Sequence, residues 1–232
     1  MTVPISQRLM CCAAMVPPGS RVADVGADHG YLGIYLLQSG VARSVVACDL
    51  RTGPLENARR NAAQYHMQAH MAFYLSDGVQ AVPPDAFDTL VCAGMGGDLI
   101  VKILSAAPWL QNDRYTLILQ PQTDIPAVRV WLGAHGFRED RAELVRDGGF
   151  LYCAMRARYG GGMTLTPGQQ FLSPALQASG SPLLEDYIQY TKNTMTKIIR
   201  GLSRASVSAD PARLQYYQAA LQEIEAYHDK NI

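Results

Sequence analysis

The sequence predicts a doubly wound α/β fold, built on a mostly parallel sheet of seven strands and followed by a C-terminal helical hairpin. Three observations lead to this prediction. Short apolar runs alternate with helical patterns from residue 20 to about residue 160, which is typical of repeated βα units. The turn sequence Asp147-Gly148-Gly149 joins the last two runs as a β-hairpin would. Beyond residue 182, apolar residues recur every three or four positions in two long segments.

The expected elements follow one another in a regular order. Short apolar runs predict strands at residues 21–25, 44–49, 71–75, 87–92, 115–119, 137–146 and 150–158. Helical patterns lie at residues 31–38, 52–65, 98–106 and 124–135. Thr52 is expected as the N-cap of the second of these helices, with Pro54 in its first turn. Parallel strands need such crossover helices, so helices should cover both faces of the sheet.

Composition places the chain among ordinary globular proteins. Apolar residues make up 48% of the chain and charged residues 17%, which excludes an intrinsically disordered chain. No apolar run reaches the ~20 residues that a membrane helix needs, and the N-terminus lacks the pattern of a secretory signal. The formal net charge is zero, so any binding of nucleic acid must depend on a local basic patch.

The cysteines indicate a reducing compartment. Their number is odd, two are adjacent, and no pair has metal-ligand spacing; they are Cys11, Cys12, Cys48, Cys92 and Cys153. We therefore expect a cytoplasmic protein with reduced thiols and no metal site.

The chain divides into three parts by pattern. Residues 1–160 should form the α/β domain, and a stretch rich in glycine and proline at residues 161–182 is typical of a linker. Residues 183–232 should form an antiparallel, coiled-coil-like helical hairpin with its turn at residues 206–211. A protein of this kind is expected to be a monomer or a weak homodimer.

The loop after the first strand has the clearest ligand-binding pattern. In doubly wound sheets, ligands bind beyond the carboxyl ends of the strands, where this chain has Asp24, Gly26, Asp28 and Gly30. Gly26 permits a tight turn and close approach of the backbone. A dinucleotide-binding loop needs glycine at the position of Asp28, because an acid there would repel a pyrophosphate. The acid suits instead the amino group or sulfonium of S-adenosylmethionine, which argues against a nicotinamide dinucleotide.

Acids and glycines also end the next strands, and they complete a candidate cofactor site. Those at the second to fourth strand ends are Asp49 and Leu50, Asp77 and Gly78, and Ala93, Gly94, Met95 and Gly96. A carboxylate at Asp49 can accept hydrogen bonds from ribose hydroxyls, and Asp77 can meet the adenine amino group. The expected substrate side holds Gly97, Gln120 and Pro121. Asp28 and His29 are the candidate catalytic residues.

Several of these segments carry a family resemblance. Five segments resemble the bacterial tRNA (adenine(22)-N1)-methyltransferases. They are residues 23–32 (ADVGADHGYL), 93–97 (AGMGG), 117–121 (LILQP) and 6–9 (SQRL), and the helix start at Gly53-Pro54. The similarity extends over nearly the whole chain, including the C-terminal hairpin. It implies a Rossmann-like methyltransferase sheet, methyl transfer from S-adenosylmethionine to N1 of an adenine in tRNA, and a cofactor site at the strand ends. Asp49 is a departure, since glutamate is common there in the family, but either carboxylate can hold a ribose.

The C-terminal hairpin carries a candidate RNA-binding surface. Lys192, Lys197, Arg200 and Arg204 occur with no acid between Asp186 and Asp210. The residues alone slightly favour a solvated helix face, whereas the resemblance implies contact with the tRNA backbone. Two other interpretations stay open: a methyltransferase of the same fold that acts on a small molecule or a protein, and a non-enzymatic module that binds a cofactor or RNA.

Overall fold

Seven strands form one sheet in the computed structural model, which describes residues 2–204 and 210–231. The strands lie in the order β3-β2-β1-β4-β5-β7-β6. Their bounds are β1 Ser20–Val25, β2 Ala42–Asp49, β3 Met71–Leu75, β4 Thr89–Gly96, β5 Thr116–Thr123, β6 Phe137–Asp147 and β7 Phe150–Tyr159. The first five strands are parallel to one another. The doubly wound, seven-stranded fold predicted from the sequence is confirmed.

The last two strands form the predicted hairpin, and β7 lies between β5 and β6. It pairs antiparallel with both of them. The carboxyl ends of β1 to β5 and the turn of the β6–β7 hairpin therefore lie on the same side of the sheet. This arrangement brings the start of β7 next to the ligand-binding edge.

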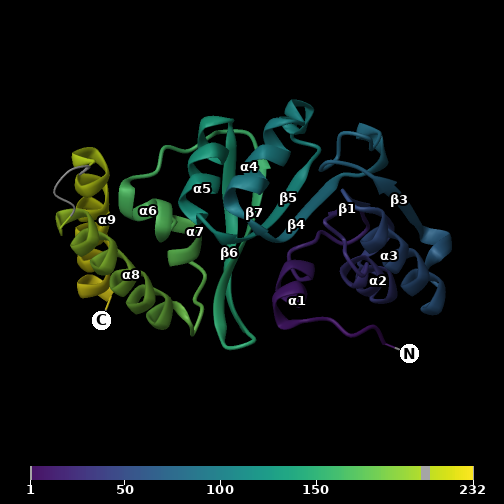
Figure 1. The fold of residues 1–232 in the computed structure, drawn as a ribbon, viewed down its shortest axis with the longest axis horizontal. Coiled ribbons are helices and arrows are strands. Elements are labelled where there is room, and N and C mark those ends of the chain that lie inside the picture. The colour runs from purple at the N-terminus through teal and green to yellow at the C-terminus, as the bar shows by residue number, and fades with distance from the viewer. Residues whose placement is uncertain (1, 205–209, 232) are drawn as a thin grey trace.

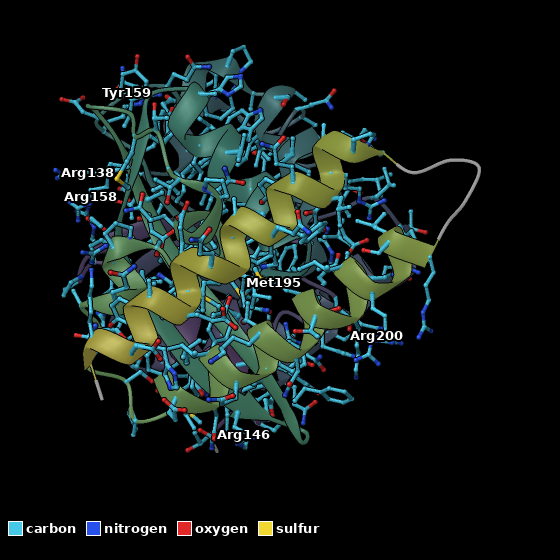
Figure 2. The ribbon with its side chains drawn as sticks, turned by 90° about the vertical axis from the view of Figure 1, so that its left-hand side faces the viewer. Arg138, Arg146, Arg158, Tyr159, Met195 and Arg200 are labelled. Carbon is cyan, nitrogen blue, oxygen red and sulfur yellow. The ribbon has the colours of Figure 1, made fainter. Side chains whose placement is uncertain are left out.

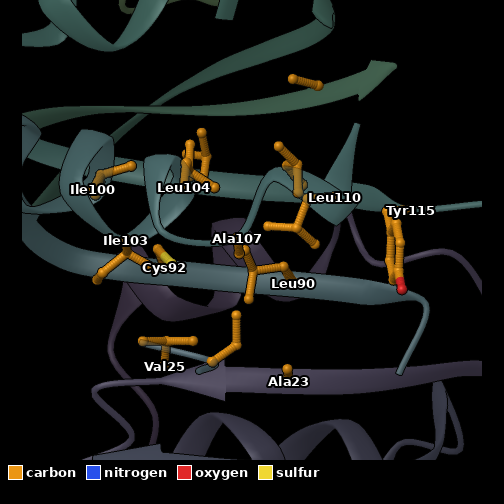
Figure 3. Close-up of a cluster of buried hydrophobic side chains, with 14 of the residues drawn as sticks. Ala23, Val25, Leu90, Cys92, Ile100, Ile103, Leu104, Ala107, Leu110 and Tyr115 are labelled. Atoms are coloured by element: carbon orange, nitrogen blue, oxygen red, sulfur yellow. The ribbon is translucent and has the colours of Figure 1, made fainter. Parts of the chain in front are cut away.

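Helices cover both faces of the sheet (Figure 1). The helices of the α/β part are α1 Gln7–Ala13, α2 Tyr31–Gln38, α3 Thr52–Gln64, α4 Gly97–Ser105 and α5 Ile125–Ala134. One core lies between the sheet and α4 and α5, where side chains of β1 and β4 meet Ile100 and Leu104 (Figure 3). The other core lies between the sheet and α1 and α2 and includes Val22, Val45 and Ile34. Successive strand residues thus point to opposite cores, as parallel strands buried on both faces require.

Two details of the α/β part differ from the sequence prediction. Arg51, not Thr52, is the N-cap of α3, and Thr52 is the first helical residue. The Asp49 carboxylate accepts a hydrogen bond from the Arg51 backbone N–H at 2.9 Å, so this turn leaves no capping role for Thr52. Helix α1 was not expected, although Ser6 caps it by accepting a hydrogen bond from the Leu9 N–H.

The segment predicted as a linker contains two short helices. They are α6 Pro167–Phe171 and α7 Pro174–Gln177, each capped by a hydroxyl side chain. Glu223 accepts hydrogen bonds from the Thr166 hydroxyl and from the Gly168 N–H, which fixes α6 against the C-terminal hairpin. Leu172 and Leu176 are buried. The glycines and prolines here shape turns and helix starts, and the boundaries at residues 160 and 182 stay a prediction.

The C-terminal hairpin consists of α8 Leu184–Arg204 and α9 Pro211–Asn231. Of its predicted turn at residues 206–211, residues 206–209 lie outside the described residues. Ile188 and Met195 of α8 are buried in a third core with Leu144 of β6 and Cys153 of β7. Figure 2 shows the two helices side by side with Met195 between them. The hairpin is therefore packed on the edge of the sheet.

No helix within residues 2–204 and 210–231 is both long enough and apolar enough to cross a membrane.

Candidate functional site

A cavity of about 480 Å³ opens at the carboxyl ends of β1 to β4. This volume lies within the roughly 300–1,000 Å³ that is usual for ligand sites. Ten of the twelve predicted cofactor residues line it, namely Asp24, Gly26, Asp28, Asp49, Leu50, Asp77, Gly78, Ala93, Gly94 and Met95. The predicted catalytic pair Asp28 and His29 also lines it. The parallel sheet brings these residues together from four separate strand ends.

Glycine at position 26 is required by the backbone of the first loop. Its φ is +69°, in the left-handed region, and its N–H donates a hydrogen bond to the Cys48 carbonyl at 2.8 Å. A Cβ at this position would lie 2.5 Å from the Met95 Cε. The loop is therefore bound to the end of β2 at Cys48, and a side chain at position 26 would collide with Met95 at the cavity wall.

Asp28 adopts a left-handed conformation with a φ of +47°, which is uncommon outside glycine and costs of order 1 kcal/mol or more. Its carboxylate lies 3.5 Å from the His29 Nε2. The His29 ring stacks on the Tyr31 ring with centroids 5.3 Å apart. Both side chains are half or more exposed, so they can reach a ligand in the cavity without first breaking a buried network.

Asp24 is a buried acid beneath this loop. Burial raises the pKa of its carboxyl from 3.8 to about 7, and the effect is partly offset by a hydrogen bond from the Gly33 N–H in the first turn of α2. The nearby Asp49 carboxylate adds to the increase in the pKa. A cationic ligand in the cavity would favour the ionised form of Asp24.

Two further acids stand at the ends of β2 and β3. Asp49 is 7% exposed and accepts the Arg51 N–H with one oxygen, which leaves its other oxygen available to a ligand. Asp77 pairs with the Lys102 ammonium at 3.1 Å. Two carboxylates of different exposure thus line one wall of the cavity.

The end of β4 is held by two residues from distant parts of the chain. The Gln120 side-chain oxygen accepts hydrogen bonds from the Gly94 N–H at 3.0 Å and from the Arg8 Nη1 at 2.7 Å. A Cβ at Gly94 would lie 2.5 Å from Arg8 Nη1, so the guanidinium lies directly against this glycine. Gln120 itself is fully buried. It positions Gly94 and Arg8 and does not line the cavity, so its predicted contact with the substrate stays a prediction.

Three of the predicted glycines do not line the cofactor cavity. Gly30 caps α2 with a φ of +70° and lies against Ala58 of α3. Gly96 and Gly97, predicted at the cofactor and at the substrate, line neither large cavity. A Cβ at Gly97 would lie 2.6 Å from the Asp124 carbonyl oxygen. These glycines allow backbone segments to pack closely, and their predicted contacts with cofactor and substrate stay a prediction.

Arg8 and Leu9 line the cavity but were absent from the predicted site residues. Their only signal was the resemblance of residues 6–9, because an isolated arginine before the first strand has no local pattern. Leu99 and Ile103 of α4 also line the cavity, and their sequence pattern indicates only an amphipathic helix.

Comparison with known proteins places this geometry in a family. The model of the methyltransferase domain family matches residues 5–155. The chain belongs to this methyltransferase family. It is 33% identical over 128 residues to the tRNA (adenine(22)-N(1))-methyltransferase of Bacillus subtilis, a match that covers 55% of this chain and about half (54%) of that enzyme.

Solved structures extend the similarity to the full length of the chain. A Streptococcus pneumoniae protein described as "a putative tRNA (m1A22) methyltransferase", in complex with S-adenosyl-L-methionine, is 28% identical, with a TM-score of 0.81. The match covers 96% of this chain and 99% of that one. The B. subtilis M1A22 tRNA methyltransferase TrmK superposes with a TM-score of 0.85 at 23% identity, over 97% of this chain and 98% of TrmK. The resemblance to the tRNA (adenine(22)-N1)-methyltransferases is confirmed.

The predicted RNA-binding residues lie away from the cofactor cavity. Lys197, Arg200 and Arg204 are exposed on α8, and Lys192 is partly buried; Arg200 extends from the outer side of the hairpin in Figure 2. Pro121 lines a second cavity, a groove of about 490 Å³ between the junction of β5 and α5 (residues 121–126) and α8. Within the described part of the chain, no group of three His, Cys, Asp or Glu side chains could hold a metal ion.

Proposed function

We propose that this protein transfers a methyl group from S-adenosylmethionine to N1 of an adenine at position 22 of tRNA. The observation that carries the proposal is the acid- and glycine-lined cavity at the ends of β1 to β4. The full-length likeness to a chain solved with S-adenosyl-L-methionine supports it, as does the name of the B. subtilis relative.

The residues of the cavity fit the chemical groups of this cofactor. The free oxygen of Asp49 can accept the ribose hydroxyls, and Asp77 can accept the adenine amino group. Asp24 and Asp28 offer negative charge to the ammonium and sulfonium groups. The side-chain-free surfaces at Gly26 and Gly94 allow the ligand to approach the backbone.

The main requirement of this reaction is that the protein hold adenine N1 in line with the methyl group of the cofactor. S-adenosylmethionine supplies an electrophilic methyl group on sulfur. N1 of adenine already carries a lone pair and needs no strong base for activation, so alignment of the two reacting atoms can contribute on the order of 7–11 kcal/mol. N1 lies on the Watson–Crick edge, and the base must be unpaired or flipped. In this proposal Gly94, held by Gln120 and Arg8, forms the surface on which the base is aligned.

Asp28 and His29 are the proposed catalytic residues. Methylation at N1 gives a cationic base whose amino group becomes more acidic, and that proton leaves for a nearby acceptor or for water. Asp28 and His29 lie 3.5 Å apart at the open side of the cavity, where either can accept this proton or a hydrogen bond from the amino group.

The tRNA would contact both parts of the molecule. The proposed substrate-side residues are Pro121, at the groove, and Lys192, Lys197, Arg200 and Arg204 on α8, whose charges can neutralise backbone phosphates. We also propose that the protein is a cytoplasmic monomer or weak homodimer.

The deciding experiment is incubation with unmodified bacterial tRNA and methyl-labelled S-adenosylmethionine, followed by nucleoside analysis and mapping. Label in N1-methyladenosine at position 22 is the expected result. Turnover without RNA would indicate a small-molecule or protein substrate, and cofactor binding without methylation of any RNA would indicate a non-enzymatic module; either result would overturn the proposal.

A further inference from the structure

None of the residues proposed above for cofactor binding or catalysis lines the groove beside the cofactor cavity. Its floor is formed by buried side chains of α8, Tyr187, Thr191 and Met195. One wall is formed by residues 121–126, which are the end of β5, Asp124 and the start of α5, and another is the start of β7. The groove therefore lies where the α/β part and the helical hairpin meet.

The lining of the groove combines ring faces with hydroxyl groups. Five aromatic side chains line it, Tyr152, Phe171, Tyr187, Tyr190 and Tyr217, together with Thr123, Thr191 and Thr194. Tyr190 stands at the mouth and is 63% exposed. Exposed aromatic rings beside hydrogen-bonding groups are what proteins use to hold unstacked RNA bases.

The charges around the groove favour an anionic occupant. Tyr190, Thr194 and Lys197 are spaced i, i+4, i+7 on α8 and so lie along one stripe of the helix. Arg213 lines the groove and lies 5.9 Å from the Tyr217 ring centroid. Asp124 is the acid in the lining, and α8 carries no acid after Asp186. This distribution suits a nucleotide, with its phosphate at the basic rim and its base inside.

The groove adjoins the cofactor cavity across a narrow ridge. Met95 lines the cavity and Pro121 lines the groove, and the two are register partners on the neighbouring strands β4 and β5, which lie about 4.8 Å apart in any sheet. The Arg8 guanidinium lies over the Tyr152 ring, 5.6 Å from its centroid. Arg8 lines the cofactor cavity and Tyr152 lines the groove, so their contact connects the two cavities.

We propose that this groove binds the unpaired nucleotide next in the RNA strand to the methylated adenine, with its base stacked on Tyr190. The inference rests on the proposed function and adds a second base-binding site to it. When the neighbouring nucleotide is bound in the groove, the two bases cannot stack on each other. The target adenine is then free to enter the cofactor cavity, whereas an adenine that stays stacked in its strand cannot reach the methyl donor.

The test places 2-aminopurine, whose fluorescence falls on stacking, at either neighbour of the target adenine in tRNA. The titration uses the full-length protein with S-adenosylhomocysteine. With the wild type and with Tyr190→Phe, we expect the fluorescence of 2-aminopurine to be quenched at one of the two neighbours. Tyr190→Leu keeps an apolar side chain but has no ring on which a base can stack, so this quenching should be lost. Loss of this stacking should weaken tRNA binding roughly fivefold or more, with an unchanged salt slope.

Controls separate this proposal from the proposed function. The same preparations are assayed for methylation and for heat on cofactor binding. Tyr190→Leu should leave the heat of cofactor binding unchanged, because Tyr190 does not line the cofactor cavity, and should lower methylation at limiting tRNA. A wild type that methylates tRNA without quenching either neighbour would overturn the groove proposal alone, as would equal affinities for the Phe and Leu variants. A wild type that neither binds nor methylates tRNA would overturn both. A change in oligomeric mass for Tyr190→Leu, with tRNA affinity intact, would show that the groove serves a second copy of the chain.

Discussion

Asp24 illustrates how one residue of a binding site opposes the stability of the fold. Because burial raises the pKa of its carboxyl from 3.8 to about 7, the native state keeps a proton that the unfolded chain loses between these values. The contribution of Asp24 to the unfolding free energy is therefore fully present below pH 3.8 and is lost as the pH rises to about 7. A ligand that carries positive charge can recover part of this cost.

Replacing Asp24 by Asn should therefore stabilise the free protein at pH 8 and weaken cofactor binding. The gain in unfolding free energy relative to the wild type should grow between about pH 4 and pH 7 and then level off, reaching the order of a few kcal/mol. Urea unfolding at several pH values, beside calorimetry with S-adenosylmethionine, measures both effects. A variant less stable than the wild type at pH 8 would contradict the buried-charge account.

Asp28 is a residue whose removal should abolish methylation and leave the fold intact. Its carboxylate is 63% exposed and contacts only a similarly exposed histidine, so Asp28→Ala should retain the wild-type melting temperature within a few degrees. Methylation of tRNA should be abolished. Turnover near that of the wild type would remove Asp28 from the proposed catalytic role.

At the scale of elements, α8 has two faces with different tasks. Ile188 and Met195 of its buried face belong to the core that also includes Leu144 of β6 and Cys153 of β7. Lys197, Arg200 and Arg204 lie on the exposed side, and among the described residues no ion pair holds them. Free cations on a rigid helix are suited to phosphate contacts.

Changing Lys192, Lys197, Arg200 and Arg204 together to Gln should weaken tRNA binding and flatten its dependence on salt. For every phosphate that is no longer neutralised, the slope of log K against log salt should fall by about 0.7–0.9. Cofactor affinity should stay the same if the two parts bind independently. Filter binding at several salt concentrations provides the measurement.

A matched pair of single changes controls for net charge. Arg138 is exposed on β6, at the opposite corner of the hairpin view from Arg200 (Figure 2). Arg200→Gln should weaken tRNA binding, whereas Arg138→Gln should not. Equal effects of the two changes would show that α8 has no special place in the interface.

At the scale of the whole molecule, a buried ion pair joins the sheet to the C-terminal part. Arg129 of α5 donates to both carboxylate oxygens of Glu139 on β6, at 2.7 and 3.2 Å. The Arg129 guanidinium also donates to the Phe171 carbonyl at 2.7 Å, and the Ser173 hydroxyl donates to Glu139. The segment at α6 and α7 is thus attached to the α/β part by charged hydrogen bonds.

Glu139→Ala should lower the unfolding free energy by about 3–5 kcal/mol, because it leaves a buried guanidinium without its counter-charge. The exposed pair Arg146–Asp186, at 2.7 Å, is the matched control, and Arg146→Ala should cost less than about 1 kcal/mol. Denaturant unfolding measures both variants. Similar costs for the two variants would contradict the structural role of the Arg129–Glu139 pair.

The amino-acid sequence alone was sufficient to predict the strands, the crossover helices and the acids and glycines at the strand ends. Residues such as Asp24, Asp49 and Gly26 were predictable because hydrophobic periodicity locates strand ends, and parallel strands end at one edge. The β6–β7 turn was predictable from Asp147-Gly148-Gly149, because left-handed turn residues leave a local signal.

The three-dimensional packing was needed to show which distant residues meet. Arg8 and Gln120 are 112 residues apart in the chain and share a hydrogen bond at the cofactor cavity. The pattern of β7 does not show that it inserts beside β5. Likewise, no local pattern shows that Gly97 lies against the Asp124 carbonyl. Local propensity acts over a few neighbouring residues, whereas these contacts depend on the packing of elements that the sequence separates.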